Sequence, residues 1–325
     1  MAVEINGDEI NFGNYKISVV PGGIYIDGVF KVDSGITKTQ AQGTVSGYAS
    51  GGYTGTFYNI IEKFPFTADA NATDVGDLTT TRHASAGQSS STNGYTGGGR
   101  NGPPATDNII DKFPFATDSN ATDVGDLTQA RRETAGQSST ESGYASGGTF
   151  SLNTVDKFPF AADTNAADVG DLTVARSELA GQSSAVSGYN SGGSPRTNTI
   201  DKFPFAADAN ATDVGDLILG LSNVTGQSST ISGYTSGGFN PSGNSNSSIE
   251  RFPFASDTNT TDVGDLTLAR NSPGGQSSTE FGYNTGGGVS PEVNIIDKFL
   301  FSSDANATDV GDLTLARYEI AGQQV

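Results

Sequence analysis

The five-residue string D-V-G-D-L occurs six times in this chain, starting at Asp74, Asp123, Asp168, Asp213, Asp262 and Asp309. Successive copies lie 45 to 49 residues apart. A period of this size is typical of propellers and solenoids, in which each repeat buries its apolar face against its neighbours. The repeat therefore constrains the fold more than any other feature of the sequence.

Each unit contains four segments that read as short strands. A-G-Q-S-S has the small residues of a crowded inner strand, and G-Y-x-S-G-G reads as a second strand that ends in a glycine pair. I-D-K-F-P-F alternates apolar and polar residues, and V-G-D-L-T follows a turn rich in Asp and Asn. Four antiparallel strands per unit predict a propeller blade, and six copies predict an all-β, six-bladed β-propeller.

The two ends of the chain predict how the ring closes and where a second domain lies. Residues 321–325 match an inner strand but precede no second strand, so we expect them to complete the blade begun near Gly43 and to close a propeller that spans residues 40–325. Residues 1–39 lack the repeat and read as strands around a P-G-G turn. This N-terminal β module is too short to bury a stable core, so we expect it to pair with copies of itself, with another protein or with the propeller.

Composition disfavours several classes of function. The net charge of −19 opposes binding to nucleic acid, and a chain without Cys has no thiolate metal site and no Cys nucleophile. No apolar stretch is long enough for membrane insertion, and the N-terminus lacks a signal-peptide pattern, so we expect synthesis in a cytoplasm without export. The single histidine, His83, has no identifiable catalytic partner. We therefore expect no enzyme, no catalytic residues and no cofactor.

The acidic turn D-x-N-x-T-D-V-G-D has two interpretations. Oxygen ligands at alternate positions, as at Asp69, Asn71, Thr73 and Asp77, loosely resemble calcium loops, but no Glu closes the loop. The alternative is a turn held by its own side-chain to backbone hydrogen bonds, and we therefore predict no metal site.

Other side chains recur once per unit and are expected to be structural. An arginine stands at the same place in five units and Leu221 in the other, and we expect it to pair with a blade carboxylate such as Asp126 or Asp171. The repeated glutamines are expected to bond neighbouring inner strands around a central channel. The tyrosines of G-Y are expected in the core, with stacking on sugars as the alternative.

The repeat resembles the Kelch-type β-propeller. In that family a glycine pair ends the second strand, an aromatic residue lies on the third, an Asn or Asp turn leads to the fourth, and an arginine follows. The matching residues in one unit are Gly147, Gly148, Phe158, Asn165, Leu172 and Arg176. The chain lacks the Trp that the family carries on its outer strand, which implies a thinner core there.

The combined repeat also resembles one found in structural proteins of marine, especially cyanobacterial, tailed phages. This resemblance implies a non-enzymatic virion protein, made in the host cytoplasm, that acts as a tail fibre, an appendage or a capsid decoration. Partners would be other virion proteins, contacted through residues 1–39, further copies of the chain, and a host-surface glycan or receptor. The alternatives are a cellular adhesion or protein-interaction propeller and a polysaccharide depolymerase.

The length of the units changes almost only in the loop after the glycine pair, so these loops are expected on one exposed face. They are residues 100–107, 194–197, 239–248 and 288–293. We predict binding there, with these candidate residues: Arg100, Asn101, Asp107, Arg196, Phe239, Asn240, Asn244 and Glu292.

Overall fold

The computed structural model describes residues 42–102, 105–150 and 152–325, and five strands between residues 3 and 31. The chain divides into two compact units, Met1–Lys38 and Thr39–Val325. Each unit is built from antiparallel strands, and the described residues contain no helix.

The N-terminal unit is a five-stranded antiparallel sheet in which each strand pairs with the next along the chain. Its strands are β1 (Val3–Asn6), β2 (Glu9–Phe12), β3 (Tyr15–Val20), β4 (Gly23–Ile26) and β5 (Val29–Lys31). Val20 on β3 pairs with Gly23 on β4, whereas Pro21 and Gly22 of the predicted turn lie outside the described residues.

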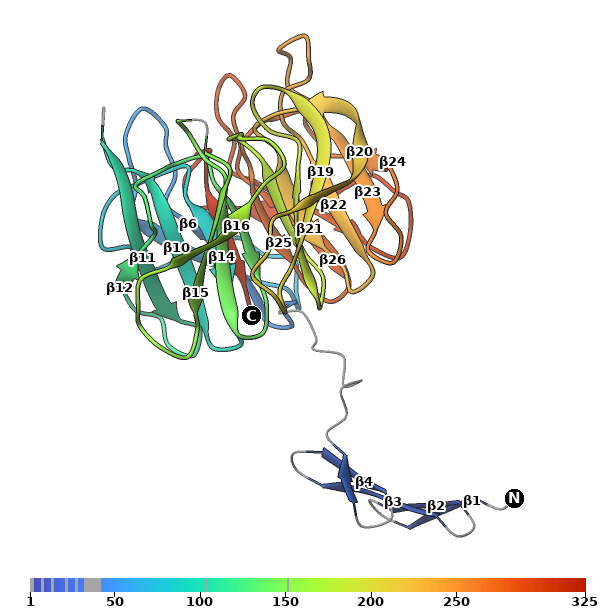
Figure 1. The fold of residues 1–325 in the computed structure, drawn as a ribbon. Helices are drawn as coiled ribbons and strands as arrows, with labels where there is room; N and C mark the ends of the chain where they lie inside the picture. The colour runs from blue at the N-terminus through green and yellow to red at the C-terminus, as the bar shows by residue number, and fades with distance from the viewer. Residues whose placement is uncertain are drawn as a thin grey trace. The chain divides into compact units, whose positions relative to one another are not determined.

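The second unit is a six-bladed β-propeller, as the repeat predicts (Figure 1). In each blade the strands are given from the inner to the outer one. Blade 1 consists of β29 (Ala321–Gln324), β6 (Ser46–Ser50), β7 (Ile60–Pro65) and β8 (Thr73–Asp77). Blade 2 consists of β9 (Ala86–Ser89), β10 (Asn93–Arg100), β11 (Thr106–Pro114) and β12 (Thr122–Asp126), and blade 3 of β13 (Ala135–Ser138), β14 (Ser142–Ser146), β15 (Thr154–Pro159) and β16 (Ala167–Asp171).

Blades 4 to 6 repeat this order around the ring. They are formed by β17 (Ala180–Ser183), β18 (Ser187–Ser191), β19 (Thr197–Pro204) and β20 (Thr212–Leu221); by β21 (Thr225–Ser228), β22 (Ser232–Ser236), β23 (Ser248–Pro253) and β24 (Thr261–Asp265); and by β25 (Gly274–Ser277), β26 (Phe281–Thr285), β27 (Ile295–Leu300) and β28 (Thr308–Asp312).

The ring closes in blade 1, where the C-terminal strand β29 pairs antiparallel with β6. Ala321 lies opposite Ser50 and Gln324 opposite Gly47, the register of the inner and second strands in the other blades. Because β29 supplies the inner strand from the far end of the sequence, β6 has a partner on both sides and is not left as an unpaired edge at this seam.

The inner strands converge so closely that only glycine fits at their centre. A Cβ built on Gly136 would lie 2.1 Å from the carbonyl oxygen of Gly87, and one on Gly181 would lie 2.2 Å from that of Gly136. The same close approach continues around the ring through Gly226, Gly275, Gly322 and Gly87. The glycine of A-G-Q-S therefore sets the spacing between blades.

Aromatic side chains fill the space between successive blades. Tyr144 on β14 packs against Phe203 and Phe205 of the next blade, with ring centroids 5.4 and 4.9 Å apart. The equivalent tyrosines of the other five blades make the same pair of contacts. The tyrosines of G-Y thus belong to the core, as expected, because this packing buries their rings.

The glycine of D-V-G-D-L is required by contact between neighbouring blades. A Cβ on Gly170 would lie 2.5 Å from the carbonyl oxygen of Ala209, in the acidic turn of the next blade. The same turn approaches the equivalent glycine of each other blade to within 2.7 Å. The repeated motif is therefore explained by the fit of one blade against the next.

The arginine pairs with a different carboxylate from the one predicted. Arg131 lies 2.9 Å from Asp156 and Arg176 lies 3.1 Å from Asp201, so Asp126 and Asp171 are not the partners. The arginine follows the outer strand of one blade and reaches the third strand of the next, which the repeat period alone does not reveal. Each pair is completely buried, so it joins successive blades rather than closing one blade on itself.

Candidate functional site

The loops of variable length lie on the face of the propeller where the inner strands begin. The residue before each inner strand contacts the glycines that end the second strand, as where Ser85 Oγ donates to Gly98 O at 3.0 Å. We call this side the loop face. The loops of blades 5 and 6 therefore open beside the central channel.

Six equivalent residues encircle the channel on this face, and we call them the mouth ring: Ala84, Glu133, Glu178, Asn223, Ser272 and Glu319. The backbone N–H of each donates to the carbonyl oxygen of its neighbour at 2.7 to 3.0 Å, and the six bonds form a closed circle. All six residues have φ between 51° and 59°. This left-handed conformation costs roughly 1–2 kcal/mol for a residue other than glycine, so the hydrogen-bonded circle holds it in place.

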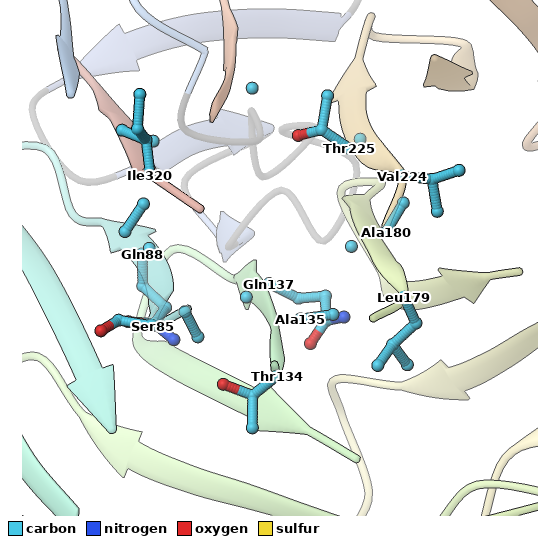
Figure 2. A pocket seen from close by; sticks show the side chains of 18 of the residues that line it. Ser85, Gln88, Thr134, Ala135, Gln137, Leu179, Ala180, Val224, Thr225 and Ile320 are labelled. Carbon is cyan, nitrogen blue, oxygen red and sulfur yellow. The ribbon is translucent and has the colours of Figure 1, made fainter. Parts of the chain in front are cut away.

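The channel behind the mouth ring is narrow and lined by the inner strands. Figure 2 shows Gln88, Gln137, Ala180, Thr225 and Ile320 arranged around it, each from a different blade. Its volume is about 150 Å³. Towards the far end, backbone N–H groups donate to serine hydroxyls of the adjacent inner strand, as from Ser138 N to Ser183 Oγ at 3.0 Å.

The repeated glutamines do not bond neighbouring inner strands, so that prediction is wrong. Gln88 Nε2 donates to Tyr144 O at 2.9 Å, and Gln137 Nε2 donates to Tyr189 O at 3.1 Å. Each acceptor lies on the second strand of the next blade along the chain, and both glutamines are buried. The long side chain passes beyond the nearest inner strand, where glycine leaves it room.

A second hollow, of about 550 Å³, lies on the loop face over blades 4 to 6, and we call it the loop pocket. Four residues of the mouth ring form one side of it. The other side consists of loop and flanking residues, mainly Phe239, Ser245, Asn271, Ser290, Glu292 and Tyr318. The volume of the loop pocket falls within the range of small-ligand sites, roughly 300–1,000 Å³.

The loop pocket is acidic. Glu178, Glu292 and Glu319 all line it. Burial is the main cause that raises the pKa of Glu178, and the charge of Glu133 is the next. Burial and the charges of Glu319 and Glu292 likewise raise the pKa of Tyr318. Acidic side chains therefore lie close together in this pocket and are partly shielded from solvent.

Five of the predicted binding residues lie at the loop pocket or in loops that border it. Phe239 and Glu292 line the pocket, and the guanidinium of the exposed Arg196 lies 5.9 Å from the centre of the Phe239 ring. Asn240 Oδ1 accepts the backbone N–H of Asn244 at 3.1 Å and so shapes the loop after Phe239. Asn244 itself is exposed.

The other three predicted residues lie on blade 2, outside the loop pocket. Arg100 ends β10, and its backbone pairs with that of His83. Asp107 is buried, and its carboxylate accepts hydrogen bonds from Asn101 Nδ2 at 3.1 Å and from the backbone N–H of Asn108 at 2.9 Å. The structure thus gives Asp107 a role in holding its own loop.

An aromatic cluster flanks the pocket at blade 1. Tyr53 stacks on His83 with ring centroids 5.0 Å apart, and it meets Tyr318 edge-on at 5.7 Å. His83 also makes a hydrogen bond to Glu319 of the mouth ring. This cluster fixes the position of Tyr318 at the pocket wall.

The oxygens of the acidic turn are used in hydrogen bonds of the protein. In blade 3, Asp163 accepts from Lys112 Nζ at 2.6 Å, Asn165 Oδ1 accepts from Asp126 N at 3.1 Å, and Asp168 accepts from its own Gly170 N. The first two bonds reach the preceding blade. Within the described residues no group of three or more His, Asp or Glu side chains is placed to hold a metal ion.

Sequence reasoning missed the mouth ring. Its six positions hold Ala, Glu, Glu, Asn, Ser and Glu, so no residue type is common to them. They share only their position, two residues before A-G-Q or its equivalent. The ring is formed by backbone hydrogen bonds, which do not depend on the side chain, so the sequence carries no pattern for it.

No protein-family model matches the chain, and no curated protein matches it. In the part of the chain that the structure describes, no helix has the length and apolar character needed to cross a bilayer.

Proposed function

We propose that this protein is a non-enzymatic binding propeller that contacts host-surface glycans through its loop face. The observation that carries the proposal is the loop pocket, where loops of blades 5 and 6 and four mouth-ring residues converge. The framework between blades repeats, whereas the loops differ in length and sequence. Variation on a rigid scaffold is the arrangement expected of a recognition surface.

We further propose that the propeller is a virion component, a tail fibre, appendage or decoration protein of a phage, attached through residues 1–39. The support is the resemblance of the repeat to those of marine tailed-phage structural proteins. The separation of the chain into two compact units is compatible with one unit for attachment and one for display.

A polysaccharide depolymerase is the second candidate. Burial raises the pKa of Glu178, and the same pocket also holds Glu292 and Glu319. This arrangement favours the depolymerase, because glycoside hydrolysis uses a pair of carboxyl groups, one of them protonated. The proposed binding function needs no such proton.

One experiment separates these functions. The full chain is incubated with polysaccharide extracted from host cells, and both binding and the release of new reducing ends are measured. We expect binding without release. Release of reducing ends that Glu178→Gln abolishes would replace the proposal with a depolymerase. Absence of binding to the polysaccharide and to intact host cells would favour a cementing role between virion proteins.

A further inference from the structure

We propose that the loop pocket binds an uncharged sugar residue and discriminates against acidic sugars such as uronates, sialic acids and sulfated hexoses. This inference rests on the proposed function, because it presupposes that the loop face binds glycans. It adds the site and the chemical class of the ligand.

The first argument is the mixture of hydrogen-bonding groups around the pocket. Glu292 supplies acceptors, Asn223 and Asn271 supply amides, and Ser245 and Ser290 supply hydroxyls. A sugar hydroxyl both donates and accepts, so a ring bearing several hydroxyls can satisfy such a mixed set. A purely apolar ligand would leave these groups without partners.

The polar groups are also held in place before any ligand arrives. Ser272 Oγ donates to Asn223 Oδ1 at 2.8 Å, and Asn271 Nδ2 donates to Gly288 O at 2.7 Å. Side chains that are already ordered lose little conformational freedom on binding. The pocket is therefore organised for a ligand of defined shape.

The second argument is the pair of aromatic rings in the lining. Phe239 and Tyr318 come from different parts of the chain and both line the pocket. Tyr318 is fixed by its edge contact with Tyr53 and by backbone hydrogen bonds between the two residues at 3.0 and 3.2 Å. Rigid aromatic rings offer large apolar surfaces at small entropic cost, and the C–H face of a pyranose packs on such surfaces.

The third argument is charge. Three carboxylates line the pocket, and the chain as a whole carries a net charge of −19. Arg196 at the edge of the pocket is exposed and lies over the Phe239 ring, and Glu319 makes a hydrogen bond to His83. A sugar that brings a further carboxylate or sulfate would meet repulsion from Glu292 and Glu319, and specificity arises as much from such repulsion as from attraction.

The test uses the full chain on an array that pairs neutral oligosaccharides with uronate or sulfated counterparts of the same linkage. We expect binding to neutral probes, at least about tenfold stronger than to their acidic counterparts. Phe239→Ala and Glu292→Gln should each weaken binding of the neutral probe by about tenfold, since each removes one kind of contact. Glu292→Lys should raise binding of the acidic counterparts relative to the wild-type chain.

Two matched controls lie outside the pocket. Phe150, which is 70% exposed in the corresponding loop of blade 3, controls for Phe239, and the exposed Glu280 controls for Glu292. Phe150→Ala and Glu280→Gln should bind as the wild-type chain does. Thermal melting of all five variants checks that each one is folded.

The outcomes separate this inference from the function on which it rests. Neutral-sugar binding that survives both Phe239→Ala and Glu292→Gln would overturn the site, and preference for acidic probes would overturn the ligand class. A chain that binds host cells but no probe on the array would also overturn the inference, while contact with the host surface would stand. A chain that binds neither would overturn both.

Discussion

At the scale of single residues, the junction between blades 4 and 5 differs from the other five. Leu221 and Ile218 stand there in place of the arginine and threonine of the repeat. The facing carboxylate, Glu250, is only 2% exposed and accepts hydrogen bonds from Ile218 N at 2.9 Å and Thr260 Oγ1 at 2.6 Å. Burial is the largest cause that raises the pKa of Glu250 above its ordinary value of 4.5.

This raised pKa predicts that the Glu250→Gln variant is more stable than the wild type at higher pH, and that the difference grows as the pH rises. The folded state keeps the Glu250 proton at pH values where the unfolded chain has lost it, so wild-type stability falls between about pH 4.5 and the folded-state pKa. Gln does not titrate, and its carbonyl oxygen still accepts hydrogen bonds. Urea unfolding from pH 4 to 8 measures the free energy of unfolding of both proteins. The difference between the variant and the wild type should increase in favour of the variant across this pH range.

The matched control is Glu62, the equivalent carboxylate of blade 1, which pairs with the buried Arg317. Glu62→Gln should lower the free energy of unfolding by about 3–5 kcal/mol, because it leaves a buried guanidinium without its counterion. Equal losses in the two variants would contradict the assignment of Glu250 as a carboxylate without a cation.

At the scale of elements, the inner strands predict which glycines are indispensable. Gly136→Ala should lower the free energy of unfolding by at least about 1–3 kcal/mol, because its Cβ would lie 2.1 Å from Gly87 O. Gly97→Ala is the control, since the nearest atom to its Cβ, Leu127 Cδ2, is 3.7 Å away, and it should change stability by less than about 1 kcal/mol. Similar effects on urea unfolding would refute the close approach of the inner strands.

The acidic turns predict independence from calcium. Their carboxylate and amide oxygens are already bonded within the protein, as at Asp163 and Asn165. The thermal midpoint should be the same with calcium and with excess chelator. Asn165→Ala, in contrast, should cost about 1 kcal/mol, because it removes the acceptor for Asp126 N. A midpoint that falls by several degrees in chelator would restore the calcium interpretation.

At the scale of the whole molecule, the closing strand predicts a loss of thermal stability and a tendency to associate on truncation. Deletion of residues 321–325 removes β29, exposes the edge of β6 and breaks the hydrogen bond from Gln323 to Tyr95 O at 3.0 Å. The midpoint should fall by at least about 5 °C, and the chain should associate as its concentration increases. A peptide of residues 321–325, added in excess, should reverse both effects.

The sequence was sufficient to predict six blades, because each strand carries a repeated pattern of its own. It failed where the partner of a side chain lies on another blade, as for Arg131 and Gln88, since a repeat defines equivalent positions but not which copies meet. Variation in loop length indicated the face that holds the loop pocket. The sequence did not predict that Glu178 and Asn223 line the pocket. They lie there because their backbone adopts a left-handed conformation, which the residue types Glu and Asn do not reveal.

The alternation of a constant frame with changeable loops has a consequence for how such a protein diversifies. Each loop starts after a glycine pair with the same backbone conformation and ends at a third strand with the same register, as in blades 3 and 4. A loop excised from one repeat and spliced into another would therefore meet compatible anchor points. Recombination among the chain's own near-identical segments would shuffle its loop face while leaving the interior untouched.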